Sequence, residues 1–380
     1  MKIGLVGCGG RGTGAAEDCL KSAPDVQLVA LADMFEDRLK SSREYLEKTK
    51  HAGVKIEHIF TGFDAYKRLL EHVDLVLLCT PPGFRPMHFE AAVEAGKHVF
   101  MEKPVAVDPA GVRRVIEAGK KAAEKKLGVV SGTQYRHHKA FIETIRRVHE
   151  GAIGTILQGR AYYNTGPLWR HDRKPGQSDM EWQLRNWYYF DWLSGDHIVE
   201  QHIHTIDVTD WAMNARPLRA SAIGGRQVRT GDEHGNIWDH FCVDYEYPGG
   251  VHVMSMTRQM PGAGYVGAHF VGTLGTAAPY RGEITGPNRW KFEGNAGALG
   301  PAYVQEHRDL IESIRAGKPL NESEQVALSS LTAILGREAA YTGKTVSWDE
   351  MLKSSLDFSP PKYDFGPLAV RPVPVPGKKR

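Results

Sequence analysis

The sequence has few of the features that mark a secreted, membrane-spanning or nucleic-acid-binding protein. Its 380 residues include only four cysteines, widely spaced and without a Cys-x-x-Cys pair, so a disulfide framework is not expected. No apolar run approaches the length that spans a bilayer. The formal net charge is only +3, whereas nucleic-acid binders usually have a concentrated basic patch. We therefore expect no nucleic-acid partner and no membrane partner.

These absences favour an ordinary globular protein of the cytoplasm. Hydrophobic residues make up 41% of the chain and charged residues 24%, which is typical of soluble globular proteins. The length suffices for two domains with substantial cores. No signal-peptide pattern precedes the first predicted strand, although an export leader removed from the mature chain would leave no trace in it.

A nucleotide-binding turn is present at the start of the chain. An apolar strand leads directly into Gly7-x-Gly9-x-x-Gly12, and an amphipathic segment follows it. Such glycines permit a tight turn, the approach of a pyrophosphate, and close packing of helix on strand. A second strand ends in Asp33, at the spacing expected for an acid that binds ribose hydroxyls, which favours NAD over NADP. The expected contacts here are Gly7, Gly9, Gly10, Arg11, Gly12 and Asp33.

Strands and helices alternate in the first part of the chain, and their order changes later. Short strands at 2–7, 26–32, 75–80, 97–101 and 128–130 alternate with helices, which predicts an α/β Rossmann domain with a doubly wound parallel sheet. After about residue 131, consecutive strands predict an α+β domain with a large, mostly antiparallel open sheet. We expect an NAD-binding domain at 1–131, a substrate-binding and oligomerisation domain at 132–356, and a Pro-rich C-terminal arm at 357–380.

A second motif, Glu102-Lys103-Pro104, directly follows the strand at 97–101. Proline disfavours the helical conformation at the residue before it, so Lys103 is expected to be extended. Ligands of open parallel sheets bind at the carboxyl ends of the strands, where this lysine would lie. For the tripeptide taken alone, a solvated loop lysine is the alternative.

These motifs resemble those of the glucose–fructose oxidoreductase, inositol dehydrogenase and rhizopine catabolism (Gfo/Idh/MocA) family. The resemblance rests on the glycine turn, on Thr80-Pro81-Pro82 with His88 soon after, and on residues 95–104, which end in Glu102-Lys103-Pro104. It implies that Lys103 lies at the active site, near the nicotinamide and the reacting hydroxyl. It also implies a homodimer or homotetramer. Further expected cofactor contacts are Thr80, Pro81, Pro82, His88, Glu102, Lys103 and Tyr135.

A third group of residues lies in a segment predicted to be helical. On one continuous helix Glu200, His204 and Asp207 share a face, which would place a carboxylate beside a general base. The family that the chain resembles usually has aspartate where this chain has Glu200, so the role of Glu200 is open. On a strand, Glu200, His202 and His204 would share a face and could bind a zinc-like ion. We expect the helix and no metal; a buried core histidine is the other interpretation of His204.

An unusually aromatic region at 182–192 precedes that helix. The apolar faces of pyranose or cyclitol rings stack on aromatic side chains, while Arg and Asn bind hydroxyls. Most of these aromatic residues are expected to belong to the core. The candidate substrate-binding residues are Lys103, Arg136, Trp169, Asn186, Trp187, Glu200 and His204.

Taken together, the motifs and the resemblance predict an NAD-dependent oxidoreductase acting on a secondary alcohol of a sugar, sugar derivative or cyclitol. His204 would accept the hydroxyl proton as hydride passes to the nicotinamide, and Lys103 would stabilise the alkoxide. Two alternatives stay open. One is a glycoside-modifying enzyme that oxidises its substrate transiently, eliminates the aglycone and recycles the cofactor. The other is a non-catalytic NAD(H)-binding protein.

Overall fold

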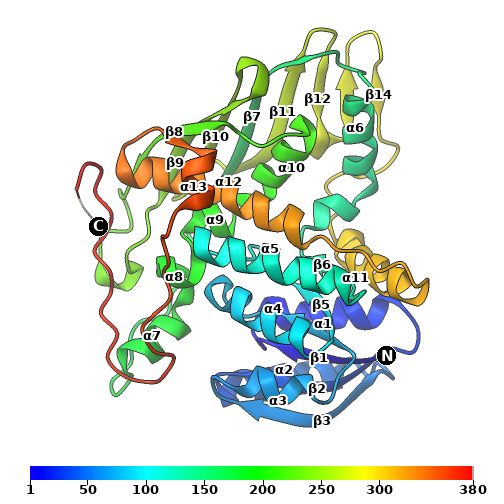
Figure 1. Ribbon diagram of the computed structural model, residues 1–380, viewed down its shortest axis with the longest axis vertical. Helices are drawn as coiled ribbons and strands as arrows, with labels where there is room; N and C mark the ends of the chain where they lie inside the picture. The colour runs from blue at the N-terminus through cyan, green and yellow to red at the C-terminus, as the bar shows by residue number, and fades with distance from the viewer. Residues whose placement is uncertain (379–380) are drawn as a thin grey trace. The chain divides into compact units, whose positions relative to one another are not determined.

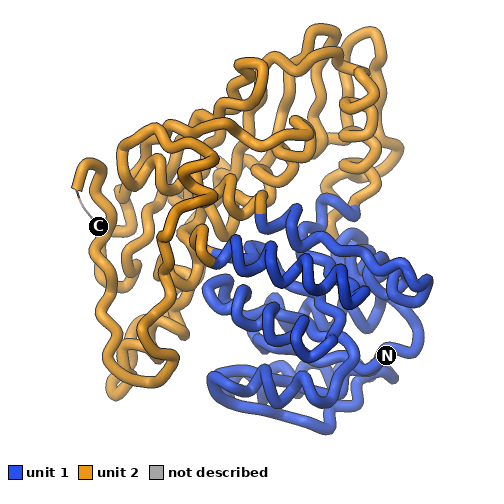
Figure 2. The backbone as a smooth tube through the Cα atoms, viewed as in Figure 1, with its two compact units in different colours: residues 1–106, 111–137, 300–327 blue, residues 107–110, 138–299, 328–380 orange. Residues whose placement is uncertain are grey.

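The computed structural model describes residues 1–378, which form two compact units (Figure 2). Unit 1 comprises residues 1–106, 111–137 and 300–327. Unit 2 comprises residues 107–110, 138–299 and the described chain from 328 onwards. Each unit is thus assembled from segments that are far apart in the sequence.

Unit 1 contains a six-stranded parallel sheet in the order β3-β2-β1-β4-β5-β6 (Figure 1). The doubly wound sheet predicted from the sequence is confirmed. Its strands are β1 (Lys2–Val6), β2 (Gln27–Asp33), β3 (Val54–Thr61), β4 (Leu75–Leu78), β5 (His98–Met101) and β6 (Val129–Ser131). Its helices are α1 (Gly10–Ser22), α2 (Glu36–Lys48), α3 (Ala65–Leu70), α4 (Arg85–Glu94), most of α5 (Pro109–Glu124) and α11 (Gly300–Arg315).

Strand β3 is the one strand of this sheet that the sequence analysis missed. It lies at the edge of the sheet, next to β2. Its residues alternate between half-buried and exposed, whereas β4 is buried throughout. The signal of β3 is this alternation, whereas the other strands are marked by the continuous apolar runs of strands covered on both faces.

Helix α11 completes the core of unit 1, although in the chain it follows the strands of unit 2. Leu310 and Ile311 belong to the same buried cluster as Leu5 and Phe100. A Cβ on Gly128 would lie only 2.8 Å from Cγ1 of Ile314. The helix therefore packs closely against the strands of this sheet.

Unit 2 contains a nine-stranded sheet in the order β14-β13-β12-β11-β7-β10-β9-β8-β15 (Figure 1). Only β10 and β7 pair in parallel, which confirms the mostly antiparallel sheet predicted for the second domain. The strands are β7 (Ile156–Thr165), β8 (Arg219–Gly225), β9 (His240–Tyr247), β10 (Val251–Gln259), β11 (Tyr265–Gly272), β12 (Thr276–Ala278), β13 (Glu283–Thr285), β14 (Trp290–Lys291) and β15 (Val346–Ser347).

The helices of unit 2 are mostly short, and two of them are fixed to the sheet by tyrosines of β9. They are α6 (Lys139–His149), α7 (Asp179–Arg185), α8 (Asp191–Ser194), α9 (His197–Glu200), α10 (Ile203–Met213), most of α12 (Ser323–Thr342) and α13 (Trp348–Lys353). Tyr245 donates to the carbonyl of Thr332 on α12 at 2.9 Å. Tyr247 donates to Asp210 on α10 at 2.6 Å. Both hydroxyls are buried, so these bonds satisfy groups that water does not reach.

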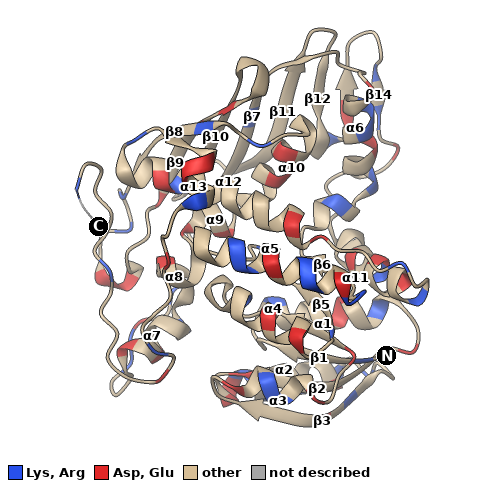
Figure 3. Cartoon of the chain, in the orientation of Figure 1, with Lys and Arg blue, Asp and Glu red and all other residues tan. Residues whose placement is uncertain are grey.

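After α13 the chain forms neither helix nor strand as far as residue 378. Within unit 2 the amide of Phe358 donates to Asp108 at 2.8 Å, and the amide of Gly377 donates to the carbonyl of Thr342 at 3.2 Å. Acidic and basic residues are mixed over the elements of both units (Figure 3). No helix among residues 1–378 has the length and apolar character needed to cross a membrane.

Candidate active site

The glycine turn between β1 and α1 has the geometry that its sequence predicts. Gly7 has a φ of +97°, and its amide donates to the carbonyl of Ala32 at 2.8 Å. A Cβ at Gly7 would lie 2.6 Å from the backbone nitrogen of Thr80, and a Cβ at Gly12 would lie 1.9 Å from the carbonyl oxygen of Gly7. Both positions therefore require glycine, because the clashing atoms belong to the backbone.

The other glycines of the turn leave the start of helix α1 accessible. The nearest atom to a Cβ built on Gly9 is Nη1 of Arg38 at 3.6 Å, and for Gly10 the described chain has no atom within 4 Å. Gly9 provides no side-chain cap, and the first turn of α1 contains no acidic residue. Its amide groups and the positive end of its dipole are thus available to an anion, as a dinucleotide diphosphate requires.

Asp33, at the end of β2, is tied to this turn. One carboxylate oxygen accepts from the amide of Cys8 at 2.7 Å, and the other accepts from the amide of Phe35 at 2.9 Å. Burial raises the pKa of Asp33, and these two amide bonds oppose that effect. The carboxylate is therefore oriented beside the glycine turn, as the ribose of NAD requires. The residues of the turn and Asp33 fit this cofactor.

His88 is bonded to the loop that follows β4, in contact with Thr80. Its Nδ1 lies 3.2 Å from the Thr80 hydroxyl, and its ring lies 4.1 Å from the ring of Tyr66. Burial lowers the pKa of His88 to about 3, so the ring is neutral. The predicted cofactor residues Thr80, Pro81 and Pro82 form the loop that His88 holds.

Arg85 is the residue of this region that the sequence analysis missed. Only 1% of it is exposed, and its guanidinium donates to the carbonyls of Leu78 (2.7 Å), Thr80 (2.6 Å) and Glu102 (3.0 Å). It therefore joins the carboxyl ends of β4 and β5. The backbone of Glu102, which immediately precedes Lys103, is held by a permanent cation.

The side chain of Glu102 is held by a second arginine. Nε of Arg11, in the first turn of α1, lies 2.9 Å from Glu102 Oε1, and the Arg11 guanidinium lies 4.7 Å from the centre of the Tyr303 ring. Although burial opposes it, the charge of Glu102 raises the pKa of Arg11. Lys103 follows at the strand end, half-buried, and its peptide bond to Pro104 is cis. The predicted residues Arg11, Glu102 and Lys103 thus lie together at one edge of the sheet.

A cluster of buried ionisable groups extends from Glu102 to α11 within unit 1. Glu306 is fully buried, and neither carboxyl oxygen has a hydrogen-bond partner among the described residues. Burial, and next the charge of Glu102, raise the pKa of Glu306 well above its usual value. Although burial opposes it, a 2.6 Å hydrogen bond to Asp309 raises the pKa of His137 to about 10. Burial therefore favours the neutral form of Glu306, whose pKa the charge of His137 lowers only in part. The predicted residues Tyr135 and Arg136 lie in the 3₁₀ turn at 134–137 that also contains His137.

In unit 2, the predicted helix around Glu200 and His204 is broken. Helix α9 ends at Glu200 and α10 begins at Ile203, with Gln201 and His202 between them. The expectation of one continuous helix is wrong. His204 and Asp207 lie three residues apart on α10 and share a face there, whereas Glu200 belongs to the preceding helix. The segment is not a strand either, so the arrangement on which the metal alternative depended is missing. Among residues 1–378, no group of three His, Cys, Asp or Glu is placed to hold a metal ion.

His202 is a structural residue at this break. Its Nε2 lies 2.6 Å from the hydroxyl of Ser255, and its Nδ1 lies 2.7 Å from the hydroxyl of Thr205. Burial lowers the pKa of His202 to about 3. The ring is therefore neutral and fixes the turn between α9 and α10 to strand β10.

The backbone of Asp196, just before α9, has a strained conformation. Its φ of 70° with ψ of 161° falls in a region almost reserved for glycine. Its buried carboxylate accepts from the amides of Trp238 (2.7 Å) and His197 (2.5 Å) and from the hydroxyl of Tyr341. Although burial opposes it, hydrogen bonding from His197 lowers the pKa of Asp196. These bonds to a charged acceptor offset the strain and fix the helix that ends in Glu200.

His204 and Glu200 are surrounded by groups that the sequence analysis did not select. The ring of His204 stacks on that of Tyr163 in β7, with centroids 6.2 Å apart. Burial, and next the charge of Glu200, raise the pKa of Tyr188. The Tyr188 hydroxyl bonds to Gln259 at the end of β10. The guanidinium of Arg229 lies 5.9 Å from the Tyr188 ring. The residues that the sequence analysis missed here come from separate elements and share no motif: Tyr163, Tyr188, Gln259 and Arg229.

The candidate substrate residues of the aromatic region lie in unit 2 with different exposures. Trp169 is 41% exposed, and its ring lies 5.9 Å from that of Trp187. Asn186 is buried; its side-chain oxygen accepts from the amide of His171 at 3.0 Å, and its nitrogen donates to the carbonyl of Glu233 at 2.9 Å. Asn186 thus holds the loop that presents Trp169.

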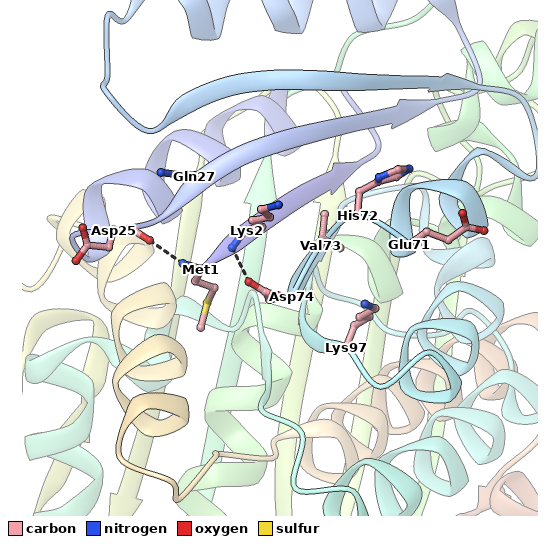
Figure 4. Close-up of a pocket in the computed structure, with 9 residues that line it drawn as sticks. All are labelled: Met1, Lys2, Asp25, Gln27, Glu71, His72, Val73, Asp74 and Lys97. Atoms are coloured by element: carbon pink, nitrogen blue, oxygen red, sulfur yellow. Dashed lines mark hydrogen bonds between the residues drawn. The ribbon is translucent and has the colours of Figure 1, made fainter.

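A separate pocket of unit 1 does not belong to this site. Figure 4 shows it at the beginning of the strands, lined by Lys2, Gln27, Asp74 and Lys97 among others. The amide of Lys2 donates to Asp74 there at 2.7 Å. In a parallel sheet the beginnings of the strands form the edge opposite to the glycine turn. This pocket is therefore excluded as the dinucleotide site.

Comparison with known families agrees with these features. Residues 1–131 match the family model described as oxidoreductase family, NAD-binding Rossmann fold, and residues 141–278 match the GFO/IDH/MocA C-terminal domain. The chain belongs to the Gfo/Idh/MocA family. Unit 1 of this Gfo/Idh/MocA protein accordingly contains an NAD-binding Rossmann fold.

Individual relatives of this Gfo/Idh/MocA protein differ in their stated activities. An inositol 2-dehydrogenase of Rubrobacter xylanophilus is 27% identical over 278 residues, which cover 73% of this chain and 70% of that protein. A glycosyl hydrolase family 109 protein of Porphyromonas gingivalis is 30% identical over 174 residues, 44% of this chain and only 36% of that relative. The crystal structure of scyllo-inositol dehydrogenase from Lactobacillus casei, with NAD(H) and scyllo-inositol bound, has a TM-score of 0.71 at 19% identity, covering 92% of this chain and 99% of that chain. This last likeness establishes the fold.

Replacing Gly12 with alanine is expected to distort the glycine turn. The added Cβ must displace the carbonyl of Gly7, and such overpacking costs about 1–3 kcal/mol. We expect NAD to bind about tenfold more weakly or worse by titration calorimetry, with a lower Tm. The control is Gly14→Ala in the same helix, where the nearest atom to a Cβ is 3.9 Å away. Equal NAD affinity of the two variants would contradict this account of the turn.

The buried Glu306 predicts a pH-dependent difference in stability. Its pKa is raised on folding, so as pH increases above the ordinary value for Glu the unfolded chain loses its proton first, and folding is disfavoured. Glu306→Gln has no such proton to lose, so its Tm relative to the unmodified protein should rise between pH 5 and pH 8. The exposed Glu312→Gln on the same helix should show no trend. A Tm difference for Glu306→Gln that is the same at both pH values would refute the neutral carboxyl.

Proposed function

We propose that this protein is an NAD-dependent oxidoreductase that acts on a secondary alcohol of a cyclitol, sugar or sugar derivative. The observation that supports this most directly is the fixed end of β5, where Arg85 and Arg11 hold Glu102 and thereby position Lys103 at the same sheet edge as the glycine turn. A lysine so placed serves a reaction at the cofactor, and a protein that only binds NAD does not need it. The inositol dehydrogenase relatives support a cyclitol as substrate class.

The residues that would hold NAD follow from the geometry of unit 1. The amides of Gly9, Gly10 and Arg11 at the start of α1 would bind the diphosphate, and Asp33 would accept the ribose hydroxyls. The carboxylate of Asp33 would also repel the additional phosphate of NADP. Thr80, Pro81, Pro82 and Tyr135 would border the nicotinamide half, with His88 supporting Thr80. Bound NAD supplies the hydride acceptor.

In this proposal Lys103 and His204 act on the same substrate hydroxyl. His204 accepts the hydroxyl proton on its imidazole while the C–H hydrogen leaves as hydride. The ammonium of Lys103 donates a hydrogen bond to the oxygen and stabilises the negative charge that develops on it. Glu200 accepts from a neighbouring hydroxyl and orients the ring.

The substrate-binding groups that we propose suit a ring with several hydroxyls. Trp169 and Trp187 provide apolar faces on which a cyclitol or pyranose ring can stack. Arg136 donates to hydroxyl groups. Asn186 is buried and acts indirectly, by holding the loop that presents Trp169. Tyr163, stacked on His204, keeps the imidazole in one orientation.

A second candidate function is glycoside modification with a recycled cofactor. The glycosyl hydrolase family 109 relative supports it, and so does Glu200 as a second acid or base near His204. In this reaction a hydroxyl is oxidised, the proton beside the new carbonyl is removed and the aglycone leaves. Water then adds to the double bond so formed, and hydride returns to the carbonyl carbon. Release of p-nitrophenol from a nitrophenyl glycoside, without net NADH formation, would distinguish it from a simple dehydrogenase.

We also propose that the protein acts as a homodimer or homotetramer in the cytoplasm. Large apolar side chains are exposed on four strands of the unit 2 sheet, which supports self-association. They are Leu157, Ile223, Met254 and Tyr265. The four cysteines are free thiols, as in a reducing compartment. Light scattering of the purified protein would test the assembly.

The proposed function is tested by NADH formation over a panel of polyols. The purified protein is incubated with NAD+ and, separately, with myo-inositol, scyllo-inositol, hexoses and hexosides, and absorbance of NADH is followed. We expect oxidation of at least one ring polyol and a preference for NAD+ over NADP+. Binding of NAD+ without turnover of any compound would favour the non-catalytic alternative.

Replacing Lys103 with methionine is expected to abolish hydride transfer. The variant keeps most of the unbranched side chain but loses the ammonium, so kcat should fall about 100-fold or more. Binding of NAD+ should change little, because its main contacts are backbone atoms and Asp33. Lys97→Met is the control, since Lys97 lies just before β5, at the opposite end of that strand. Undiminished turnover by Lys103→Met would show that this lysine takes no part in the reaction.

A further inference from the structure

The C-terminal arm (residues 357–378) binds the segment of unit 2 that leads to Glu200. The amide of Leu368 donates to Asp179 at 3.1 Å, and the carbonyl of Leu368 accepts from the side-chain amide of Gln183 at 2.7 Å. The amide of Met180 donates to the carbonyl of Gly366 at 3.2 Å. Helix α7 is thus fixed by the arm at successive positions.

The strongest of these contacts joins Arg371 of the arm to Asp191. Their charged groups are 2.5 Å apart, and only 1% of Asp191 is exposed. The Arg371 guanidinium also lies 3.7 Å from the centre of the Phe358 ring, which fixes its plane. Removing a cationic partner from a buried carboxylate is destabilising. The arm therefore supplies one charged partner of a buried carboxylate in this part of unit 2.

Asp191 is placed where such a contact affects the candidate substrate residues. It begins α8, directly after the segment with Trp187 and Tyr188, and its amide donates to Asn236 at 3.0 Å. Asn236 in turn donates its amide to the carbonyl of Tyr189 at 3.1 Å. A shift of Asp191 would therefore disturb Tyr189 and its neighbour Tyr188, whose hydroxyl is affected by the charge of Glu200.

The arm also reaches the strained turn at Asp196. Trp238 donates its indole N–H to the carbonyl of Pro374 at 3.2 Å and its backbone amide to Asp196 at 2.7 Å. The prolines of the arm restrict its backbone before folding, so holding it in place costs less conformational entropy. They are Pro360, Pro361, Pro367, Pro372, Pro374 and Pro376.

We propose that Arg371 is a positioning residue, which fixes the substrate-binding segment at 186–200 through Asp191. The arm is then part of the support of the active site. The effect of Arg371 on the kinetics rests on the proposed function, whereas its effect on the conformational order of residues 186–200 does not.

The test compares Arg371→Gln and Arg371→Lys with Lys362→Gln in the full chain. Lys362 belongs to the same arm, but its side chain is 77% exposed and pairs with the exposed Asp364. Two properties are measured: amide hydrogen exchange of residues 186–200, and kinetics with NAD+ and myo-inositol, or whichever polyol of the panel is oxidised fastest.

For Arg371→Gln we expect faster exchange at 186–200 and a KM for the polyol raised about tenfold or more. The Kd for NAD+ should stay within about twofold, because its site lies in unit 1, and Lys362→Gln should match the unmodified protein. Arg371→Lys keeps the charge but loses the planar group, so it should give a smaller change of the same kind. If Arg371→Gln does not fold, the same two measurements on Arg371→Lys test the proposal.

Unchanged exchange at 186–200 together with an unchanged polyol KM would overturn the proposal. A rise in the KM with a matching loss of NAD+ binding would also overturn it, since that pattern indicates general destabilisation. Faster exchange in a protein that oxidises no polyol in any form would support the positioning role and refute the proposed function instead. Within the Asp191→Asn background, Arg371→Gln should have little further effect; full additivity of the two changes would count against their coupling.

Discussion

The contacts of Glu102 are the constraint on which the rest of unit 1 depends. A strand that ends at a ligand-binding edge has carbonyl groups that no neighbouring strand pairs, and buried carbonyls without a partner are costly. Arg85 donates to the carbonyls of Leu78, Thr80 and Glu102 at once; that of Leu78 also accepts from the amide of Glu102 at 3.0 Å. Bonds from a charged donor are worth about 1.5–3 kcal/mol each. Arg11 then binds the Glu102 side chain from the helix that follows the glycine turn. Arg85 and Arg11 thereby hold together three segments: the loop after β4, the end of β5 and the start of α1.

In unit 2 a buried carboxylate, that of Asp196, stabilises the local backbone, as the guanidinium of Arg85 does in unit 1. The strained backbone of Asp196 is stable because the buried carboxylate gathers donors from three other positions, Trp238, His197 and Tyr341. His202, at the following break, is neutral and bonded at both ring nitrogens. The side chains of Asp196 and His202 thus have hydrogen-bond partners although they are buried. Fully bonded buried polar groups specify a single conformation.

The sequence was sufficient for the features that depend on local backbone chemistry. The glycine turn, Asp33 and the parallel strands next to it followed from spacing and from continuous apolar runs. Strand β3 was missed because it is half-exposed and alternates. The break between α9 and α10 was missed because neither glycine nor proline marks it; it results from contacts of His202 with Ser255 on a distant strand. Arg85 could not be identified either, since three of its acceptors are backbone carbonyls, which have no sequence signature.

The same distinction explains why the cofactor is easier to infer than the substrate. The groups that fit NAD are backbone amides and one carboxylate within the first 33 residues, where the local sequence determines the geometry. The groups around His204 and Glu200 are side chains from β7, from the 3₁₀ turn at 187–189, from the loop after β8 and from the end of β10. Their arrangement depends on the sheet register and on Asp191, which is paired with an arginine from the last part of the chain. Substrate preference can therefore change through residues far from the motifs, while the cofactor turn stays the same.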